Sequence, residues 1–282
     1  MLPFLILILG VTFGSLSALV YKSAAVAEAR RLPMLAVERL TVISLLGIYA
    51  CFGGGYVFVP QVLIVSIIAG LAIASARLLL LSAMRLGPAG LSWTIINLSV
   101  SVPVVFSITR GEHPTAWQVT GLLLTPVCIM LMCQGNGTTA QSIRRGWILC
   151  ITATFILDGV FSTCFKLVKE MELESSRHMF LLLLNCVAFT VVATSTLVRR
   201  RLPRRTELKR GLLSGLCIGL SAIFWVEAIM MLPGIVFFPS ATILGIIIIL
   251  ILMRVVWQEK LGRRQLYGAV LAIAAILMIA LW

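Results

Sequence analysis

Residues 254–282 have the sequence RVVWQEKLGRRQLYGAVLAIAAILMIALW, in which a short polar turn is followed by a long apolar run. Residues 111–132, GEHPTAWQVTGLLLTPVCIMLM, have the same arrangement. Three residues of the earlier segment recur in the later one at the same spacing and 147 positions further on: Glu112, Gln118 and Gly121 match Glu259, Gln265 and Gly268. Repetition at about half the length of the sequence indicates one structural unit present twice.

The composition does not fit an ordinary soluble domain. Hydrophobic residues make up 60% of the 282 residues and charged residues 12%, against about 45–50% and about 25% in soluble proteins. A membrane-spanning helix needs about 20 apolar residues, so ten of them fit into this sequence with short connections. We therefore expect the lipid bilayer to be the medium in which this protein folds.

Ten apolar runs follow one another, and we expect a spanning helix in each. Their approximate limits are 2–21, 34–52, 59–84, 89–108, 117–133, 146–168, 178–198, 211–231, 233–256 and 265–282. A polar linker, 134–145, separates a first five-helix repeat, 1–133, from a second, 146–282. Because five is an odd number, the second copy is inverted across the membrane, as in many secondary transporters. The predicted fold is an all-α integral membrane protein of ten transmembrane helices, built as two inverted repeats.

The formal net charge of +13 comes from basic residues in the turns. The turns after the first, third, fifth, seventh and ninth runs hold most of them, above all RRRLPRRTELKR at 199–210. The other internal turns hold only Arg110, Lys166, Lys169 and Arg177. Basic turns face the cytoplasm, so we expect a multi-pass protein of a cell (inner) membrane with both termini non-cytoplasmic. No nucleic-acid-binding pattern is present, and we expect no nucleic-acid partner.

The sequence contains none of the enzyme motifs that such a chain could carry. It lacks the Walker A, HExxH and GxSxG patterns, which mark ATPases, zinc peptidases and serine hydrolases. The seven cysteines are scattered and form no CxxC pair, so we interpret them as small buried thiols: Cys51, Cys128, Cys133, Cys150, Cys164, Cys186 and Cys217. We expect no enzymatic activity, no cofactor and no metal site.

Beyond the two Glu-x5-Gln-x2-Gly turns, the halves match in Pro88 and Pro233, which open the fourth and ninth runs, and in Lys22 and Lys166, which close the first and sixth. On these residues the sequence resembles a ten-helix, EamA-type member of the drug/metabolite transporter superfamily. The resemblance covers the whole sequence, although His113-Pro114 departs from the family's usual turn. It implies a bundle in which the first four helices of each half surround a central cavity while the fifth and tenth lie at the periphery. It also implies movement, often outward, of small organic solutes such as amino acids, nucleotide-like or sugar-like metabolites, or drugs.

The repeated turn residues and the two lysines have plainer roles. Glu112 and Glu259 each stand just before a helix, whose positive N-terminal end an acidic residue stabilises, so we expect a structural role in each hairpin. Lys22 and Lys166 lie near helix ends, where long side chains reach the membrane surface.

Charged residues within the apolar runs are the main candidates for function. An ionisable side chain at the bilayer centre costs roughly 2.5–3.5 kcal/mol, so it is expected to face a cavity or a partner. Five residues meet this description: Glu38, Arg39, Arg77, Asp158 and Glu227. Arg77 could hold a carboxylate or phosphate of a substrate, because its guanidinium matches both anions. The alternative is an ion pair with Glu38 or Glu227 that locks helices together.

Asp158 belongs to a polar stripe of residues four apart, Thr154, Asp158, Ser162 and Lys166, which lie on one face of a helix. The stripe suits the wall of a water-lined cavity, and a desolvated aspartate could couple transport to protons. The alternative is a hydrogen bond or ion pair within the bundle.

Several uncharged residues complete the candidate site. Trp93 and Asn97 share a helical face and could line the cavity, whereas Asn185 fits either substrate contact or a bond between helices. Trp225 is better explained by packing or by anchoring at the membrane surface. Prolines interrupt the fourth, fifth and ninth runs, where they can act as hinges: Pro103, Pro126 and Pro239.

These features favour a secondary transporter that moves a small organic metabolite by alternating access. The expected substrate is anionic or amino-acid-like, the expected direction is export, and proton or ion coupling is left open. The expected partners are the solute and the lipid bilayer, and the protein is a monomer or a homodimer. One alternative is a flippase, in which Arg77 would hold the phosphate of a lipid or lipid-linked carrier. Another is a membrane enzyme or receptor without transport, for which no catalytic constellation is visible.

Overall fold

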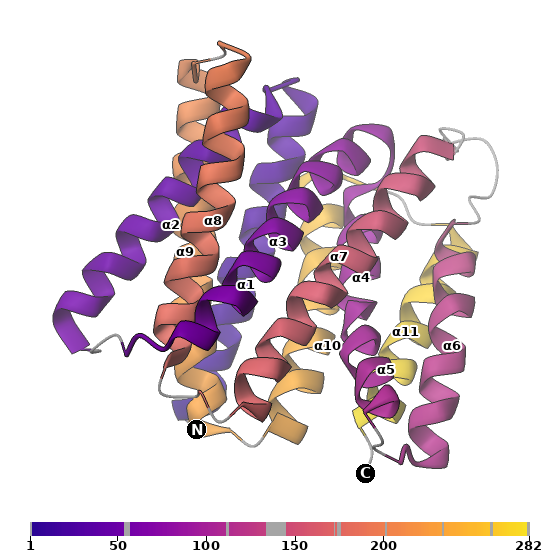
Figure 1. Cartoon of the computed structure of the whole chain (residues 1–282). Helices are drawn as coiled ribbons and strands as arrows, with labels where there is room; N and C mark the ends of the chain where they lie inside the picture. The colour runs from indigo at the N-terminus through magenta and orange to yellow at the C-terminus, as the bar shows by residue number, and fades with distance from the viewer. Residues whose placement is uncertain are drawn as a thin grey trace.

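The computed structural model describes residues 2–53, 57–110, 113–133, 145–171, 173, 176–200, 202–232, 234–259 and 262–280. Within these ranges the chain forms helices and no strand. The helices are α1 (Leu2–Val26), α2 (Arg31–Gly53), α3 (Pro60–Leu86), α4 (Ala89–Asn97), the 3₁₀ helix η1 (Leu98–Val100), α5 (Ser101–Thr109), α6 (Ala116–Cys133), α7 (Arg145–Glu170), α8 (Arg177–Val198), α9 (Arg205–Met231), α10 (Gly234–Val256) and α11 (Arg263–Ala280). Because α4, η1 and α5 follow one another without a gap, the described residues make ten helical rods (Figure 1).

Each predicted apolar run corresponds to one rod, so the all-helical prediction is confirmed. Seven of the described helices are long and apolar enough to cross a membrane. Two shorter apolar helices cover Ala116–Met132 and Ser240–Val256. These lengths and compositions are compatible with a membrane-embedded protein.

The expected start of one helix is wrong. The basic segment before residue 211 was assigned to a turn, but α9 begins at Arg205. The carboxylate of Glu207, in the first turn, accepts a hydrogen bond of 2.5 Å from the backbone N–H of Arg204. This bond satisfies an N–H at the helix start that would otherwise lack a partner, and it lets the helix extend beyond the apolar run.

The fourth rod is irregular in its middle. The 3₁₀ turn Leu98–Val100 separates α4 from α5, and Pro103 follows shortly after it. The proline ring cannot donate to the carbonyl of Ser99, four residues earlier, and crowds that carbonyl. A short 3₁₀ turn relieves the conflict. In contrast, α6 and α10 continue through Pro126 and Pro239.

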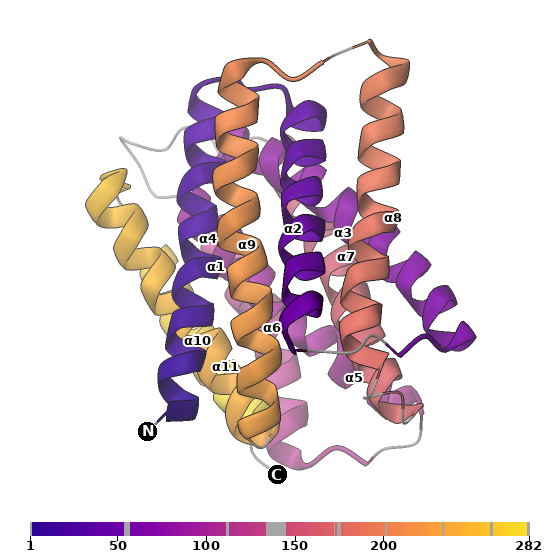
Figure 2. The same cartoon turned by 90° about the vertical axis from the view of Figure 1, so that its left-hand side faces the viewer.

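The helices form a bundle whose two ends differ. Helix α1 begins and α11 ends at the same end, the lower one in Figures 1 and 2. The turn between α1 and α2 and the turn between α8 and α9 lie at the opposite end. That end carries the segment 199–210, and we call it the basic end.

Each half of the chain packs chiefly against the other half. Helix α9 packs against α1 and α2, and α3 packs against α7 and α8. Contacts also join α2 to α8, α4 to α10 and α6 to α11. The pair α6–α11 lies at one edge of the bundle (Figure 1). The core is therefore made by interdigitation of the halves.

Glycines allow the closest contacts between these helices. A Cβ placed on Gly215 of α9 would lie 2.6 Å from Cβ of Thr41 and 2.8 Å from the carbonyl oxygen of Glu38, both on α2. A Cβ on Gly70 of α3 would lie 2.7 Å from the carbonyl oxygen of Leu184 on α8. Such approaches are typical of membrane helices, where small residues let backbones meet.

The repeated turns also meet their counterparts. A Cβ on Gly121 of α6 would lie 2.7 Å from the carbonyl oxygen of Ala275 on α11. A Cβ on Gly268 of α11 would lie 3.2 Å from the carbonyl oxygen of Cys128 on α6. Gly268 and Ala275 stand 147 positions after Gly121 and Cys128. Gly268 therefore meets Cys128 itself, and Gly121 meets Ala275, the residue that corresponds to Cys128 in the second half.

The repeated glutamines form matching hydrogen bonds. The side-chain oxygen of Gln118 accepts a bond of 3.0 Å from the N–H of Thr115. That of Gln265 accepts a bond of 2.9 Å from the N–H of Gly262. In both places the glutamine satisfies a backbone donor just before the helix. The sequence match therefore reflects the same local structure.

Substitution of Gly215 by alanine should destabilise the protein, because the new methyl group would overlap α2. Overpacking of this kind costs about 1–3 kcal/mol. Gly47→Ala is the matched control, since a Cβ on Gly47 would meet nothing within 4 Å and alanine is favoured over glycine in a helix by about 0.5–1 kcal/mol. Thermal unfolding in detergent should show a lower midpoint for Gly215→Ala alone. Equal midpoints for the two variants would contradict the close contact of α2 and α9.

Candidate functional site

A buried ion pair on α2 forms the first part of the candidate site. The side chains of Glu38 and Arg39 are 0% and 4% exposed, and Arg39 Nη2 lies 3.0 Å from Glu38 Oε1. The same carboxylate oxygen accepts a bond of 2.9 Å from the hydroxyl of Tyr21 on α1. Arg39 Nη1 donates to the side-chain oxygen of Asn185 on α8 at 2.9 Å. Three helices therefore meet at one pair of opposite charges.

One oxygen of this carboxylate is left over. Glu38 Oε2 is buried and has no hydrogen-bond partner among the described residues. Unsatisfied buried polar atoms are rare and costly, so this oxygen is able to accept a further hydrogen bond, and a role of Glu38 in substrate binding remains a prediction. Asn185 bonds both to Arg39 and, through its amide nitrogen, to the carbonyl of Leu181 at 2.8 Å. Its role in joining helices is confirmed, whereas substrate contact remains a prediction.

Arg77 and Trp93 form the second part. The guanidinium carbon of Arg77, on α3, lies 5.4 Å from the centre of the Trp93 ring, on α4. This is cation–π geometry. The ring of Tyr21 meets that of Trp93 edge-on, with centroids 6.2 Å apart. Tyr21 therefore links Arg77 and Trp93 to the buried ion pair.

Arg77 is not locked in either of the ion pairs considered from the sequence. Glu38 bonds to Arg39, and Glu227 accepts a hydrogen bond from the hydroxyl of Tyr49. Arg77 is half-buried, and its Nε has no hydrogen-bond partner in the described part of the protein. The recorded neighbours of its charge are the face of the Trp93 ring and, through an electrostatic interaction, the carboxylate of Asp158.

Asp158 forms the third part. Its carboxylate, on α7, accepts a bond of 2.9 Å from the hydroxyl of Ser99 on η1. This is the hydrogen bond that the structural alternative predicted. Thr154 is buried, whereas Asp158, Ser162 and Lys166 are half-buried. That this stripe lines a cavity remains a prediction.

Two further candidates occupy different places. The amide nitrogen of Asn97 donates to the carbonyl of Trp93 at 3.1 Å, and a Cβ on Gly245 of α10 would lie 3.6 Å from Asn97 Oδ1. Asn97 thus faces α10. Trp225 meets Phe237 edge-on, with ring centroids 4.9 Å apart, which supports the packing interpretation.

Glu227 stands apart from the other candidates. Its hydrogen-bond partner Tyr49 meets His178 edge-on, with ring centroids 5.7 Å apart. Among the described residues no hydrogen bond or ion pair joins Glu227 to Arg77 or to Glu38. The sequence placed these charges in one group, but the structure separates Glu227 from the rest.

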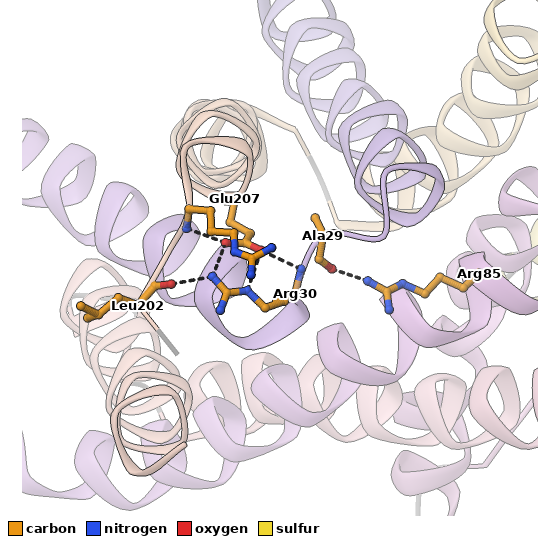
Figure 3. A network of polar contacts seen from close by, with 6 residues as sticks. Ala29, Arg30, Arg85, Leu202 and Glu207 are labelled. Carbon is orange, nitrogen blue, oxygen red and sulfur yellow. Dashed lines mark hydrogen bonds and ion pairs between the residues drawn. The ribbon is translucent and has the colours of Figure 1, made fainter. Parts of the chain in front are cut away.

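Two carboxylates clamp the basic end. Glu207 is 3% exposed and forms an ion pair with Arg30 at 2.9 Å. The Arg30 backbone N–H also donates to it at 3.1 Å, and Arg30 Nη2 continues to the carbonyl of Leu202 at 2.6 Å (Figure 3). The bond to Glu207 raises the pKa of the Arg30 guanidinium, so the pair stays charged. This clamp fastens the α1–α2 turn to the start of α9.

Glu259 forms the second clamp. Its two oxygens accept bonds of 3.0 Å each from the N–H groups of Ala89 and Gly90, at the start of α4. Lys22 Nζ lies 3.1 Å from the same carboxylate. The structural role expected for Glu259 is therefore confirmed, and the helix start that it stabilises among the described residues is that of α4. Lys22 thus has a carboxylate partner in this turn, and its position at the membrane surface stays a prediction. Glu112 lies outside the described residues.

The sequence did not single out two members of the site. Tyr21 lies on α1, the helix whose Gly10 and Gly14 closely approach α9. Ser99 carried no signal beyond its place four residues before Pro103. In the described residues no three His, Cys, Asp or Glu side chains gather as a metal site, and the described cysteines are free: Cys128, Cys150, Cys164, Cys186 and Cys217.

Comparison with known proteins supports the fold and gives no family. No protein-family model matches the sequence, and no curated protein matches it. Solved structures do match, and one of them aligns with a TM-score of 0.61 over 96% of this chain and 94% of its own. It is 14% identical and is described only as "Crystal structure of protein". At that identity the likeness concerns the fold alone.

Replacing Glu38 by glutamine should destabilise the protein strongly, because Arg39 would keep a buried charge without its counterion. Breaking a buried pair from one side costs about 3–5 kcal/mol. The double variant Glu38→Gln/Arg39→Met removes both charges and should recover much of the loss. Thermal unfolding in detergent measures both. An unchanged midpoint for Glu38→Gln would show that the pair does not hold the three helices.

Replacing Glu259 by glutamine should speed amide hydrogen exchange at residues 89–92, because the start of α4 loses its charged acceptor. Exchange measured by mass spectrometry should rise there and stay unchanged in residues 27–30. Glu207→Gln is the matched control: exchange should rise in residues 27–30 and stay unchanged in residues 89–92. If both variants loosened both segments equally, the two clamps would be one cooperative unit.

Proposed function

We propose that this protein is a ten-span secondary transporter of the drug/metabolite transporter superfamily, in which two inverted five-helix halves move a small organic solute by alternating access. The observation that carries the proposal is Arg77, a half-buried cation that stands over the Trp93 ring, interacts electrostatically with Asp158, and among the described residues has no carboxylate within ion-pair distance. A solute carboxylate or phosphate would supply the missing charge. Trp93 beneath the guanidinium and Asp158 on α7 complete a site with both signs of charge.

The inverted repeat has support from the packing. Exchange of the two halves converts α1–α9 into α7–α3 and α2–α9 into α8–α3, and all four pairs are in contact. The same exchange maps α2–α8, α4–α10 and α6–α11 onto themselves. The Gly121 and Gly268 contacts repeat this relation at the level of single residues. In transporters of this type the solute lies where the halves meet.

The two clamps bear on which conformation of the proposed transport cycle this structure represents. Glu207 with Arg30, and Glu259 with Lys22, each tie the first half of the chain to the second at the basic end. If the basic end faces the cytoplasm, as its charge favours, this conformation is closed on that side. Opening would separate the same groups, so both carboxylates belong to the gating cycle. We place the protein in a cell (inner) membrane with both termini outside the cytoplasm.

One observation favours the flippase alternative, and another counts against it. An apolar groove of about 290 Å³ lies between α5, α6 and α7, lined among others by Val102, Leu122 and Phe155. It could accept an acyl tail. However, Arg77 does not line it, so the groove gives no site for the lipid phosphate. A solute transporter therefore remains the preferred function, with substrate identity and ion coupling to be determined.

Arg77→Ala should abolish transport, because the solute would lose the charge that selects it. Candidate solutes are found first by thermal shift of purified protein with carboxylic acids, amino acids and sugar phosphates, since a bound ligand raises stability. Uptake of the best one is then followed in liposomes without ATP. Arg77→Lys should retain part of the flux, and Arg263→Ala, exposed at the basic end, should retain all of it. Normal flux in Arg77→Ala would exclude this site; loss in Glu227→Gln alone would move it to Glu227.

A further inference from the structure

The first turns of α9 carry a basic groove that the proposed transport does not use. Arg205, Lys209 and Leu213 follow one another at intervals of four and are all exposed, so they lie on one face of the helix. Together with Thr206 and Arg210 they line a groove of about 460 Å³. Helix α9 begins at the basic end, at the top of the bundle in Figure 2.

In the part of the chain that the structure describes, no carboxylate neutralises the positive charge of the groove. Among the described residues neither Arg205 nor Lys209 forms an ion pair, and Arg210 Nε donates to the neutral hydroxyl of Ser23 at 3.1 Å. The nearest acidic residue on α9, Glu207, is buried and already bonded to Arg30 and to the Arg204 N–H. Arg205 and Lys209 are exposed, so both cations are accessible to an external anion.

Exposed apolar side chains adjoin the groove, further along α9 from its N-terminal end. Leu212, Leu213 and Leu216 are 43%, 52% and 43% exposed. At a rise of 1.5 Å per residue, Leu213 lies about 12 Å along the axis from Arg205. Cationic side chains are thus followed by apolar ones along the helix axis. Lys209 and Leu213 lie about 6 Å apart along that axis, which is roughly the depth of one headgroup region. This order suits a ligand with an anionic head and an apolar tail.

We infer that the groove formed by Arg205, Thr206, Lys209, Arg210 and Leu213 binds an acidic phospholipid, with its phosphate on the cations and its acyl chains along the leucines. Arginine holds phosphate through paired N–H donors, and lysine acts as a point charge. The inference rests on placing the chain in a bilayer, and not on the transport of any solute. The lipid would hold the start of α9, and with it the Glu207 clamp, at the membrane surface.

Lipid titration of the purified protein tests this site. Thermal unfolding in dodecyl maltoside is followed with added dioleoyl phosphatidylglycerol, dioleoyl phosphatidylcholine, or inorganic phosphate. Phosphatidylglycerol should raise the midpoint saturably, and the other two should not. Arg205→Ala/Lys209→Ala should raise the half-saturating concentration roughly 30-fold, since each cation near an anionic lipid contributes about a factor of five. Arg199→Ala/Arg200→Ala removes the same charge from exposed positions outside the groove and should change it less than threefold.

Each other result overturns the inference. Equal loss in the two double variants would indicate a diffuse electrostatic field, and an equal effect of phosphatidylcholine would remove the need for an anion. An equal effect of inorganic phosphate would assign the groove to free anions. The comparison of the three additives on the unmodified protein decides the matter even if a variant does not fold. Solute flux through Arg77 is measured separately, so failure here leaves the transport proposal untouched.

Discussion

The architecture depends on how closely helix backbones can approach one another. Apolar side chains gain nothing by leaving lipid for other apolar side chains, so membrane helices associate through close packing and polar contacts. Gly215 meets the backbone of α2 at Glu38 itself, and Gly70 meets α8 at Leu184, next to Asn185. The tight contacts thus lie beside the buried Glu38–Arg39 pair and its partner Asn185. A bulkier residue at either position would move α2 or α8 and with it the bond between Arg39 and Asn185.

Carboxylate contacts hold both the buried Glu38–Arg39 pair and the basic end together, but the surroundings of the carboxylates differ. Glu38 is buried between helices and, within the described ranges, has one carboxylate oxygen without a hydrogen-bond partner. Glu207 and Glu259 lie at helix starts, where backbone N–H groups and a cation occupy their oxygens. Saturated carboxylates hold elements in place. An unsaturated one inside the bundle keeps capacity for a proton or a ligand.

Sequence alone predicted the rods well and the contacts poorly, for physical reasons. Apolar runs of about 20 residues have few alternatives to a helix in lipid, and charges within them must face one another or water, which located Arg77 and Asp158. Partners depend on helix rotation, which no local pattern fixes. Tyr21 escaped notice because a tyrosine costs little among apolar residues. The start of α9 was misplaced because a single acidic residue, Glu207, converts a basic turn into helix.

The contact between α6 and α11 has the form of an isologous interface. Gly121 meets Ala275 as Gly268 meets Cys128, so one surface patch packs against its own counterpart. Interfaces of this kind normally join identical subunits across a twofold axis. Nothing in the contact itself requires the two patches to be in one polypeptide. A separate five-helix chain with the sequence features of either half would therefore carry the surface needed to pair with a second copy of itself.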